Sequence, residues 1–106
     1  MTMLKIQEHA LEVVRAMRPV LAGVARHDAD LARQMRRALT SIPLNIAEGQ
    51  GRRNGHGRQR LETAMGSANE VAACLRTADA LGYVDADERV LDALDRIART
   101  MRVLMR

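Results

Sequence analysis

The chain of 106 residues is long enough for one modest hydrophobic core, and its formal net charge is +4. It has no Phe or Trp and a single Tyr, which argues against a β-sandwich, and its one cysteine excludes an intrachain disulfide. Charged residues interrupt every apolar run before the roughly 18 residues that a membrane span needs, and the first residues do not resemble a signal peptide. We therefore expect a single-domain, cytoplasmic protein that does not enter the membrane.

Residues 3–26 are predicted to form the first helix, because apolar residues recur at alternating spacings of three and four. This stripe comprises Met3, Ile6, Ala10, Val13, Met17, Val20 and Val24. Its phase continues through Pro19, which favours a kinked helix, and a break at Arg18 is the alternative. A second apolar stripe comprises Leu4, Leu11, Val14 and Leu21. Since one bundle core needs one stripe, the second predicts burial against another subunit.

Residues 29–51 are predicted to form the second helix, with Asp28 or Asp30 as its N-cap and Pro43 as the site of a second kink. Its inward positions are Leu31, Met35, Ala38, Ile42 and Ile46. The glycines that follow predict the end of this helix and a loop; they are Gly49, Gly51, Gly55 and Gly57.

Residues 57–81 and 86–105 are predicted to form the third and fourth helices. The inward stripe of the third is rich in alanine and comprises Leu61, Ala64, Ala68, Val71, Leu75 and Ala78. We interpret Cys74 as a small packing residue, and Gly82 ends this helix. Asp85 and Glu88 form an approximate capping box for the fourth helix, whose inward positions are Val90, Leu94, Ile97, Met101 and Leu104. Four helices with short connections predict an all-α, up-down-up-down four-helix bundle.

Polar residues of the second helix form a stripe with spacings of four, four, three and four; they are Arg37, Ser41, Asn45, Glu48 and Arg52. Glu48 and Arg52 have the favourable acid-first order for an ion pair. Asn45 is a poor helix former, so we expect it to have a fixed partner, and the third helix offers Ser67, Asn69 and Glu70. We interpret Arg37, Ser41, Asn45, Glu48 and Glu70 as a structural polar network that sets the register of the two helices. A direct functional role is the alternative.

The segment Gln34–Gly49, which reads QMRRALTSIPLNIAEG, closely resembles the signature of the four-helix-bundle family named for the 23S rRNA intervening-sequence protein. Gly66–Glu70 resembles the second conserved block of that family and Leu81–Tyr83 the third, so the likeness covers about residues 30–85. The same fold family includes the accessory variability determinant protein of diversity-generating retroelements, a basic pentamer that binds nucleic acid.

This resemblance implies a left-handed four-helix bundle with a basic surface that assembles into a homo-oligomer, a pentamer being the expected form. The chain departs from the family pattern in three places. It lacks the aromatic residues common in the family's first helix, Pro19 lies earlier than the usual proline, and the loop between the second and third helices is unusually rich in glycine.

The sequence shows no arrangement typical of catalysis or metal binding. His9, His27 and His56 are scattered, and none follows a glutamate by three positions as in di-metal bundles. One cysteine supports no zinc site, and the glycines after the second helix lack the Gly-Lys-Ser/Thr ending of a phosphate loop. We therefore expect no enzyme activity, no metal and no cofactor.

Positive charge is concentrated in residues 33–60, which contain seven arginines and one acid and carry a net charge of +6, whereas the rest of the chain carries −2. Arginine binds phosphate groups bidentately; a high-GC genome is the alternative reason for its abundance. The candidate nucleic-acid-binding residues are Arg33, Arg36, Arg52, Arg53, Arg58 and Arg60. No aromatic residue is available there for base stacking, so we expect contacts to the backbone.

We therefore expect a non-catalytic, oligomeric scaffold that binds nucleic acid, RNA in particular. The alternative is a protein-interaction module whose basic surface docks an acidic partner such as a polymerase or a ribosomal factor. A bundle that binds a small molecule would need a cavity in the core, and the small alanine face of the third helix disfavours one.

Overall fold

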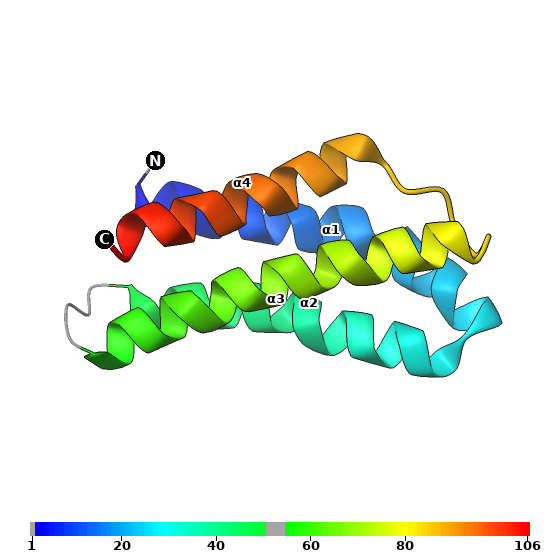
Figure 1. Ribbon diagram of the computed structural model, residues 1–106, viewed down its shortest axis with the longest axis horizontal. Coiled ribbons are helices and arrows are strands. Elements are labelled where there is room, and N and C mark those ends of the chain that lie inside the picture. Colours follow the sequence, from blue (N-terminus) through cyan, green and yellow to red (C-terminus); the bar gives the residue numbers. More distant parts are fainter. Residues whose placement is uncertain (1, 51–54) are drawn as a thin grey trace.

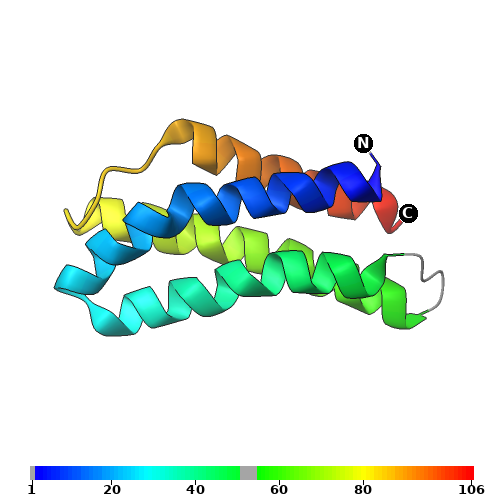
Figure 2. The same cartoon turned by 180° about the vertical axis from the view of Figure 1, so that it is seen from behind.

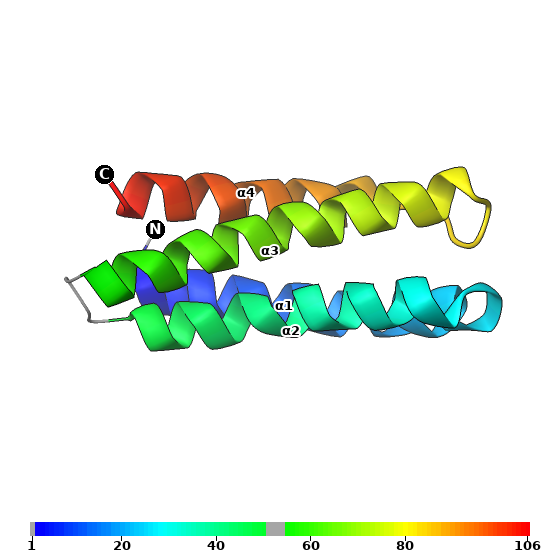
Figure 3. The same ribbon diagram turned by 60° about the horizontal axis from the view of Figure 1, so that its bottom comes forward.

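In the computed structural model, the described residues 2–50 and 55–106 form four helices and no strand. They are α1 (Met3–His27), α2 (Ala29–Gly49), α3 (Gly55–Ala80) and α4 (Glu88–Leu104). Figure 1 shows antiparallel neighbours, with both chain termini at one end of the bundle. Figure 3 shows α1 and α2 in one layer and α3 and α4 in the other. Each helix packs on its neighbours in sequence, and α4 also packs on α1, which confirms the predicted all-α, up-down-up-down four-helix bundle.

α1 is one helix that contains Pro19, so the alternative of a break at Arg18 is wrong. Figure 2 shows its axis changing direction in the second half. The first apolar stripe faces the core: Ile6, Met17 and Val24 are fully buried, and α1 ends where Asp28 takes an extended conformation.

Asp28 is also the N-cap of α2, because its side chain accepts a hydrogen bond from the Leu31 backbone N–H at 3.0 Å. α2 continues through Pro43 to Gly49, two residues short of the predicted end. Its inward positions lie as expected: Met35, Ala38, Ile42 and Ile46 are buried and Leu31 is partly buried.

α3 begins at Gly55, two residues before the predicted start at residue 57, so Gly55 is helical and the prediction that it belongs to a loop is wrong. α2 approaches α3 closely at this end. A Cβ atom on Gly49 would lie 2.9 Å from Leu61 Cδ2 and 3.2 Å from the Gly57 carbonyl oxygen. The absence of side chains lets the two helices meet here. The whole predicted inward stripe of α3 is buried, and so is Cys74.

α3 ends in a Schellman motif at Gly82, which has a φ of +79°. The Tyr83 N–H donates to the Ala78 carbonyl at 2.9 Å, and the Gly82 N–H donates to the Asp79 carbonyl at 2.9 Å. The ring of Tyr83 stacks on that of His27 at the end of α1, with centroids 5.1 Å apart. The Leu81–Tyr83 block thus ends α3 and fastens this end of the bundle to α1.

α4 is capped by Asp87, whose side chain accepts from the Arg89 backbone N–H at 2.8 Å, so the predicted capping box of Asp85 and Glu88 is wrong. Leu94, Ile97 and Met101 are buried as predicted. The two remaining inward predictions fall at the ends of the helix: Val90 is partly buried and Leu104 is 37% exposed. Leu91 and Ala98 complete the buried face.

Candidate nucleic-acid interface

Ser41 is the centre of the polar contacts between α2 and α3. The Asn45 side-chain amide donates to the carbonyl oxygen and to Oγ of Ser41, both at 2.9 Å. From α3, the Ser67 hydroxyl donates to Ser41 Oγ at 2.8 Å. All three residues are half-buried. The Ser-x-x-x-Asn pair of α2 thereby has a specific partner on the facing helix, Ser67.

The charged members of the predicted network do not join this cluster. Glu48 forms an ion pair with Arg60 of α3, 3.0 Å from Oε2 to Nε, and both side chains are about half exposed. Arg37 and Glu70 are exposed, and neither forms an ion pair within the described part of the chain. The predicted partner of Glu48, Arg52, lies outside the described residues.

The six candidate nucleic-acid-binding arginines fall into three groups. Arg52 and Arg53 lie outside the described residues. Arg36 is exposed on α2 and has no ion pair among the described residues. The other three have partners within the chain: Arg33 pairs with Asp30, Arg60 pairs with Glu48, and Arg58 donates to a backbone carbonyl.

Arg58 bridges the start of α3 and the end of α4. Its Nη1 donates to the carbonyl oxygen of Met105, the C-cap residue of α4, at 2.7 Å. A cation at a helix C-terminus interacts favourably with the helix dipole. The arginine-rich sequence around Arg58 predicts contact with an external ligand, and it does not reveal the Met105 contact because the two residues are far apart in the chain.

An open groove lies between α2 and α3 and has a volume of about 590 Å³. Its lining is mostly polar and consists of Asp30, Arg33, Gln34, Arg37, Ala38, Ser41, Ser67 and Glu70. The residues that line this one space therefore include two arginines, two acids and two serines. The groove was not predicted from the sequence, although the spacing of Gln34, Arg37 and Ser41 places them on one face of the helix.

Among the described residues, two titratable groups have shifted pKa values, and both shifts have local causes. Burial raises the pKa of the Cys74 thiol, and the nearby Glu70 carboxylate adds to this effect. The hydrogen bond from the Arg89 backbone N–H lowers the pKa of Asp87, as the cap role requires. A buried thiol held in its neutral form is a poor nucleophile, which agrees with a packing role for Cys74.

The second stripe of α1 is only partly covered. Leu4 and Leu11 are 63% and 39% exposed, while Val14 and Leu21 pack partly against the core. On the neighbouring helix α2, Leu44 is 63% exposed. Leu11 and Leu44 lie nearly equally far in sequence from Asp28, so the antiparallel helices place them at the same level of the bundle.

The described residues contain no group of three or more His, Cys, Asp or Glu side chains placed to hold a metal ion. In the same part of the chain, no helix combines the length and apolar character needed to cross a membrane.

Comparison with known proteins agrees with the fold. The profile of a family described as 23S rRNA-intervening sequence protein matches residues 2–106, well beyond the segment that carries the signature. Among solved structures, the chain is similar to a crystal structure of a protein of unknown function from the S23 ribosomal protein family of Bacteroides thetaiotaomicron. The TM-score is 0.84 and the identity 18%, over 95% of this chain and 98% of that one, a likeness that concerns the fold alone. A comparison with the curated proteins finds no match.

Proposed function

The chain belongs to the 23S rRNA-intervening sequence protein family, and from this premise we propose that it is a non-catalytic, oligomeric, cytoplasmic scaffold that binds nucleic acid, RNA in particular. The observation that carries the proposal is the concentration of positive charge, a net +6 within residues 33–60 against −2 elsewhere. Three arginines of that segment lie on the exposed side of α2; they are Arg33, Arg36 and Arg37.

The internal partners of several arginines do not prevent phosphate binding. The ion pairs of Arg33 and Arg60 are exposed, and exposed ion pairs contribute only about 0–1 kcal/mol, so a phosphate can replace the carboxylate. Arg58 uses one donor for the Met105 carbonyl, and a guanidinium has five N–H donors. Arg36 has no ion pair to exchange among the residues that the structure describes.

The experiment that tests this proposal is a titration of labelled single-stranded RNA against salt concentration, read by fluorescence anisotropy. We expect affinity to fall steeply as salt rises, because each neutralised phosphate releases counterions. The variant Arg33→Ala/Arg36→Ala removes about two phosphate contacts and should reduce the slope of log K against log salt by about 1.4.

The matched control is Arg96→Ala/Arg99→Ala on α4. These arginines have the same spacing, and Arg99 pairs with Asp95 as Arg33 pairs with Asp30. The control should keep the slope of the unaltered protein. An affinity that does not change with salt, or an equal reduction of the slope in both variants, would refute binding through the α2 arginines.

The second candidate is a module that docks an acidic protein, such as a polymerase or a ribosomal factor, through the same arginines. A partner that remains bound in a pull-down after nuclease treatment, and that is lost with Arg33→Ala/Arg36→Ala, would favour it.

We further propose a homo-oligomer, with five copies as the expected number. The exposure of Leu4, Leu11 and Leu44 supports this part of the proposal. Kinship with the accessory variability determinant protein stays a prediction.

A further inference from the structure

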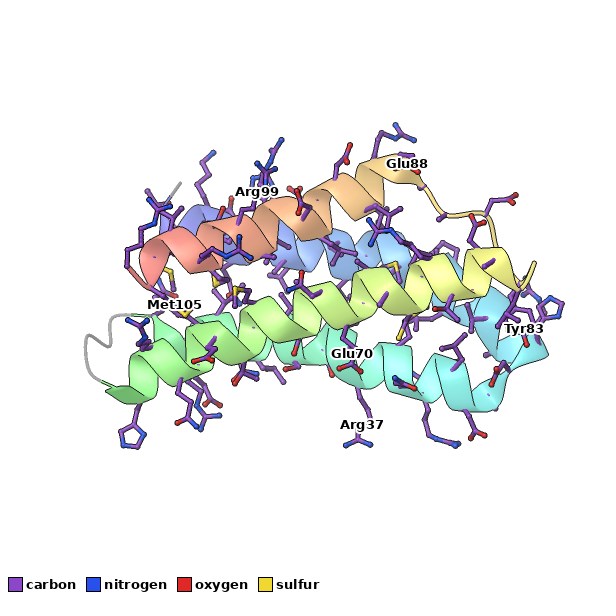
Figure 4. All side chains as sticks on the ribbon, viewed as in Figure 1. Arg37, Glu70, Tyr83, Glu88, Arg99 and Met105 are labelled. Atoms are coloured by element: carbon purple, nitrogen blue, oxygen red, sulfur yellow. The ribbon has the colours of Figure 1, made fainter. Side chains whose placement is uncertain are left out.

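The groove between α2 and α3 is lined by residues that carry hydrogen-bond donors and by one acceptor, Glu70, that is free of ion pairs among the described residues. Ser41 and Ser67 are half-buried within it, whereas Arg37 and Glu70 are exposed. Figure 4 shows the Glu70 side chain directed from α3 toward α2, and Arg37 extending away from the bundle on the same side. The two charged groups form no ion pair in the described part of the chain, so both can bind a ligand.

Ser41 and Ser67, which together form the serine cluster, supply one more hydrogen-bond donor. Ser41 Oγ accepts from Asn45 and from Ser67, and these two bonds occupy its two lone pairs. The two hydroxyls carry two hydrogens, and the bond between them uses one. Whichever serine donates, the other hydroxyl hydrogen has no acceptor among the described residues, and both serines line the groove. The serine cluster therefore offers this hydrogen to an acceptor in the groove.

Together these groups match a ligand that has an anion beside a hydroxyl. The guanidinium of Arg37 and the serine hydroxyl suit phosphate oxygens, because charge-assisted hydrogen bonds from arginine to phosphate are strong. The Glu70 carboxylate only accepts hydrogen bonds, so it requires a donor such as a sugar hydroxyl and repels a phosphate without one. Asp30 is already paired with Arg33. A volume of about 590 Å³ accommodates a nucleotide.

We propose that this groove binds a ribose-phosphate unit, with Arg37 on the phosphate and Glu70 accepting a hydrogen bond from the ribose 2′-hydroxyl. The inference rests on the proposed nucleic-acid binding and names RNA as the ligand, because DNA lacks the 2′-hydroxyl through which proteins distinguish the two. A free ribonucleotide offers the same chemistry as an RNA strand.

The test compares labelled RNA and DNA of one sequence and about 12 nucleotides, within the site sizes of single-strand binding proteins. We expect the unaltered protein to bind RNA about tenfold more tightly than DNA, as one hydrogen bond to a charged group allows. Glu70→Gln should remove most of that preference, and DNA affinity should stay constant or rise. Arg37→Ala should weaken both ligands, and Arg96→Ala on α4 is the control of equal charge. Competition by adenosine 5′-monophosphate and its 2′-deoxy form tests the free nucleotide as the source.

The outcomes separate the groove from the general proposal. RNA preference that survives Glu70→Gln, or an Arg37→Ala variant that behaves like Arg96→Ala, overturns the groove assignment while salt-dependent binding stands. Absence of binding to both oligonucleotides refutes the proposed function. If labelled adenosine 5′-monophosphate then binds by itself, more tightly than its 2′-deoxy form and in a Glu70-dependent manner, the groove chemistry stands with a free nucleotide as ligand.

Discussion

The guanidinium of Arg58, in the first turn of α3, donates a hydrogen bond to the backbone carbonyl of Met105, 2.7 Å away at the end of α4. The chain between the two residues folds back along the whole bundle, so this contact closes one end of the α3–α4 pair. Figure 4 shows Met105 at that end. An arginine whose position suggested an external ligand thus also stabilises the fold.

Arg58→Ala should lower the free energy of unfolding by about 1 kcal/mol, because it removes a charge-assisted hydrogen bond and a cation at a helix C-terminus. Urea denaturation followed by circular dichroism measures the change. Arg102→Ala, an exposed arginine in the last turn of α4, is the control and should cost a few tenths of a kcal/mol. Equal losses in the two variants would show that the Met105 contact contributes nothing specific.

Ser41→Ala should destabilise the bundle by about 1–3 kcal/mol, since Asn45 and Ser67 lose their common acceptor while half-buried. Thr40→Ala removes a neighbouring hydroxyl that is exposed and that, among the described residues, bonds within α2 to the Arg37 carbonyl. We expect that control to change stability by less than about 0.5 kcal/mol. Thermal unfolding measures the stability of both variants. A Ser41→Ala protein as stable as the unaltered one would contradict the role of Ser41 as the common acceptor.

Gly49→Ala and Gly66→Ala should change stability in opposite directions. A Cβ at position 49 would meet Leu61 at 2.9 Å and the Gly57 backbone at 3.2 Å, whereas a Cβ at position 66 meets nothing within 4 Å. Forcing α2 and α3 apart should cost about 1–3 kcal/mol, while alanine in the exposed helical site should gain about 0.5–1 kcal/mol. Melting temperatures of the two variants check the sign, and an equal or more stable Gly49→Ala protein would disprove the close approach.

The double variant Leu11→Ser/Leu44→Ser should reduce the mass measured by light scattering toward that of a single chain, 11.8 kDa, if the exposed face of α1 and α2 is buried between copies. Burial of a leucine contributes about 1.5–3 kcal/mol, so the loss of two leucines from each interface should weaken assembly strongly. Val103→Ser provides a control, because Val103 is 53% exposed on α4. A monomeric unaltered protein would refute assembly altogether.

The raised pKa of Cys74 predicts how stability depends on pH. A thiol that binds its proton more tightly in the folded state stabilises the fold below its ordinary value of 9.0, and this contribution is lost as pH rises above that value. The difference in unfolding free energy between the unaltered protein and Cys74→Ala should therefore shrink between neutral and strongly alkaline pH.

The thiol should also react slowly with a disulfide reagent until urea unfolds the chain. Rapid labelling of the native protein would contradict its burial.

Local patterns predicted most of the fold. Apolar spacings of three and four in α1, α2 and α3 identified the buried faces, and Gly82 marked the end of α3. These features depend on residues within about one helical turn of one another, which is why spacing alone reveals them. The errors lie where neighbours compete locally: Asp87 caps α4 in preference to Asp85, and α3 extends back to Gly55.

The concentration of arginine in residues 33–60, and with it the region where a phosphate would bind, is a property of the sequence itself. Tertiary structure decided what each arginine faces: Arg60 meets Glu48, Arg58 meets Met105, and Arg37 shares a groove with Glu70. A charge interacts over a few ångströms with whatever the facing helix presents, and that register depends on packing across the core rather than on spacing along one helix. The sequence therefore located the charge, and only the packing of α2 against α3 placed an acceptor beside it.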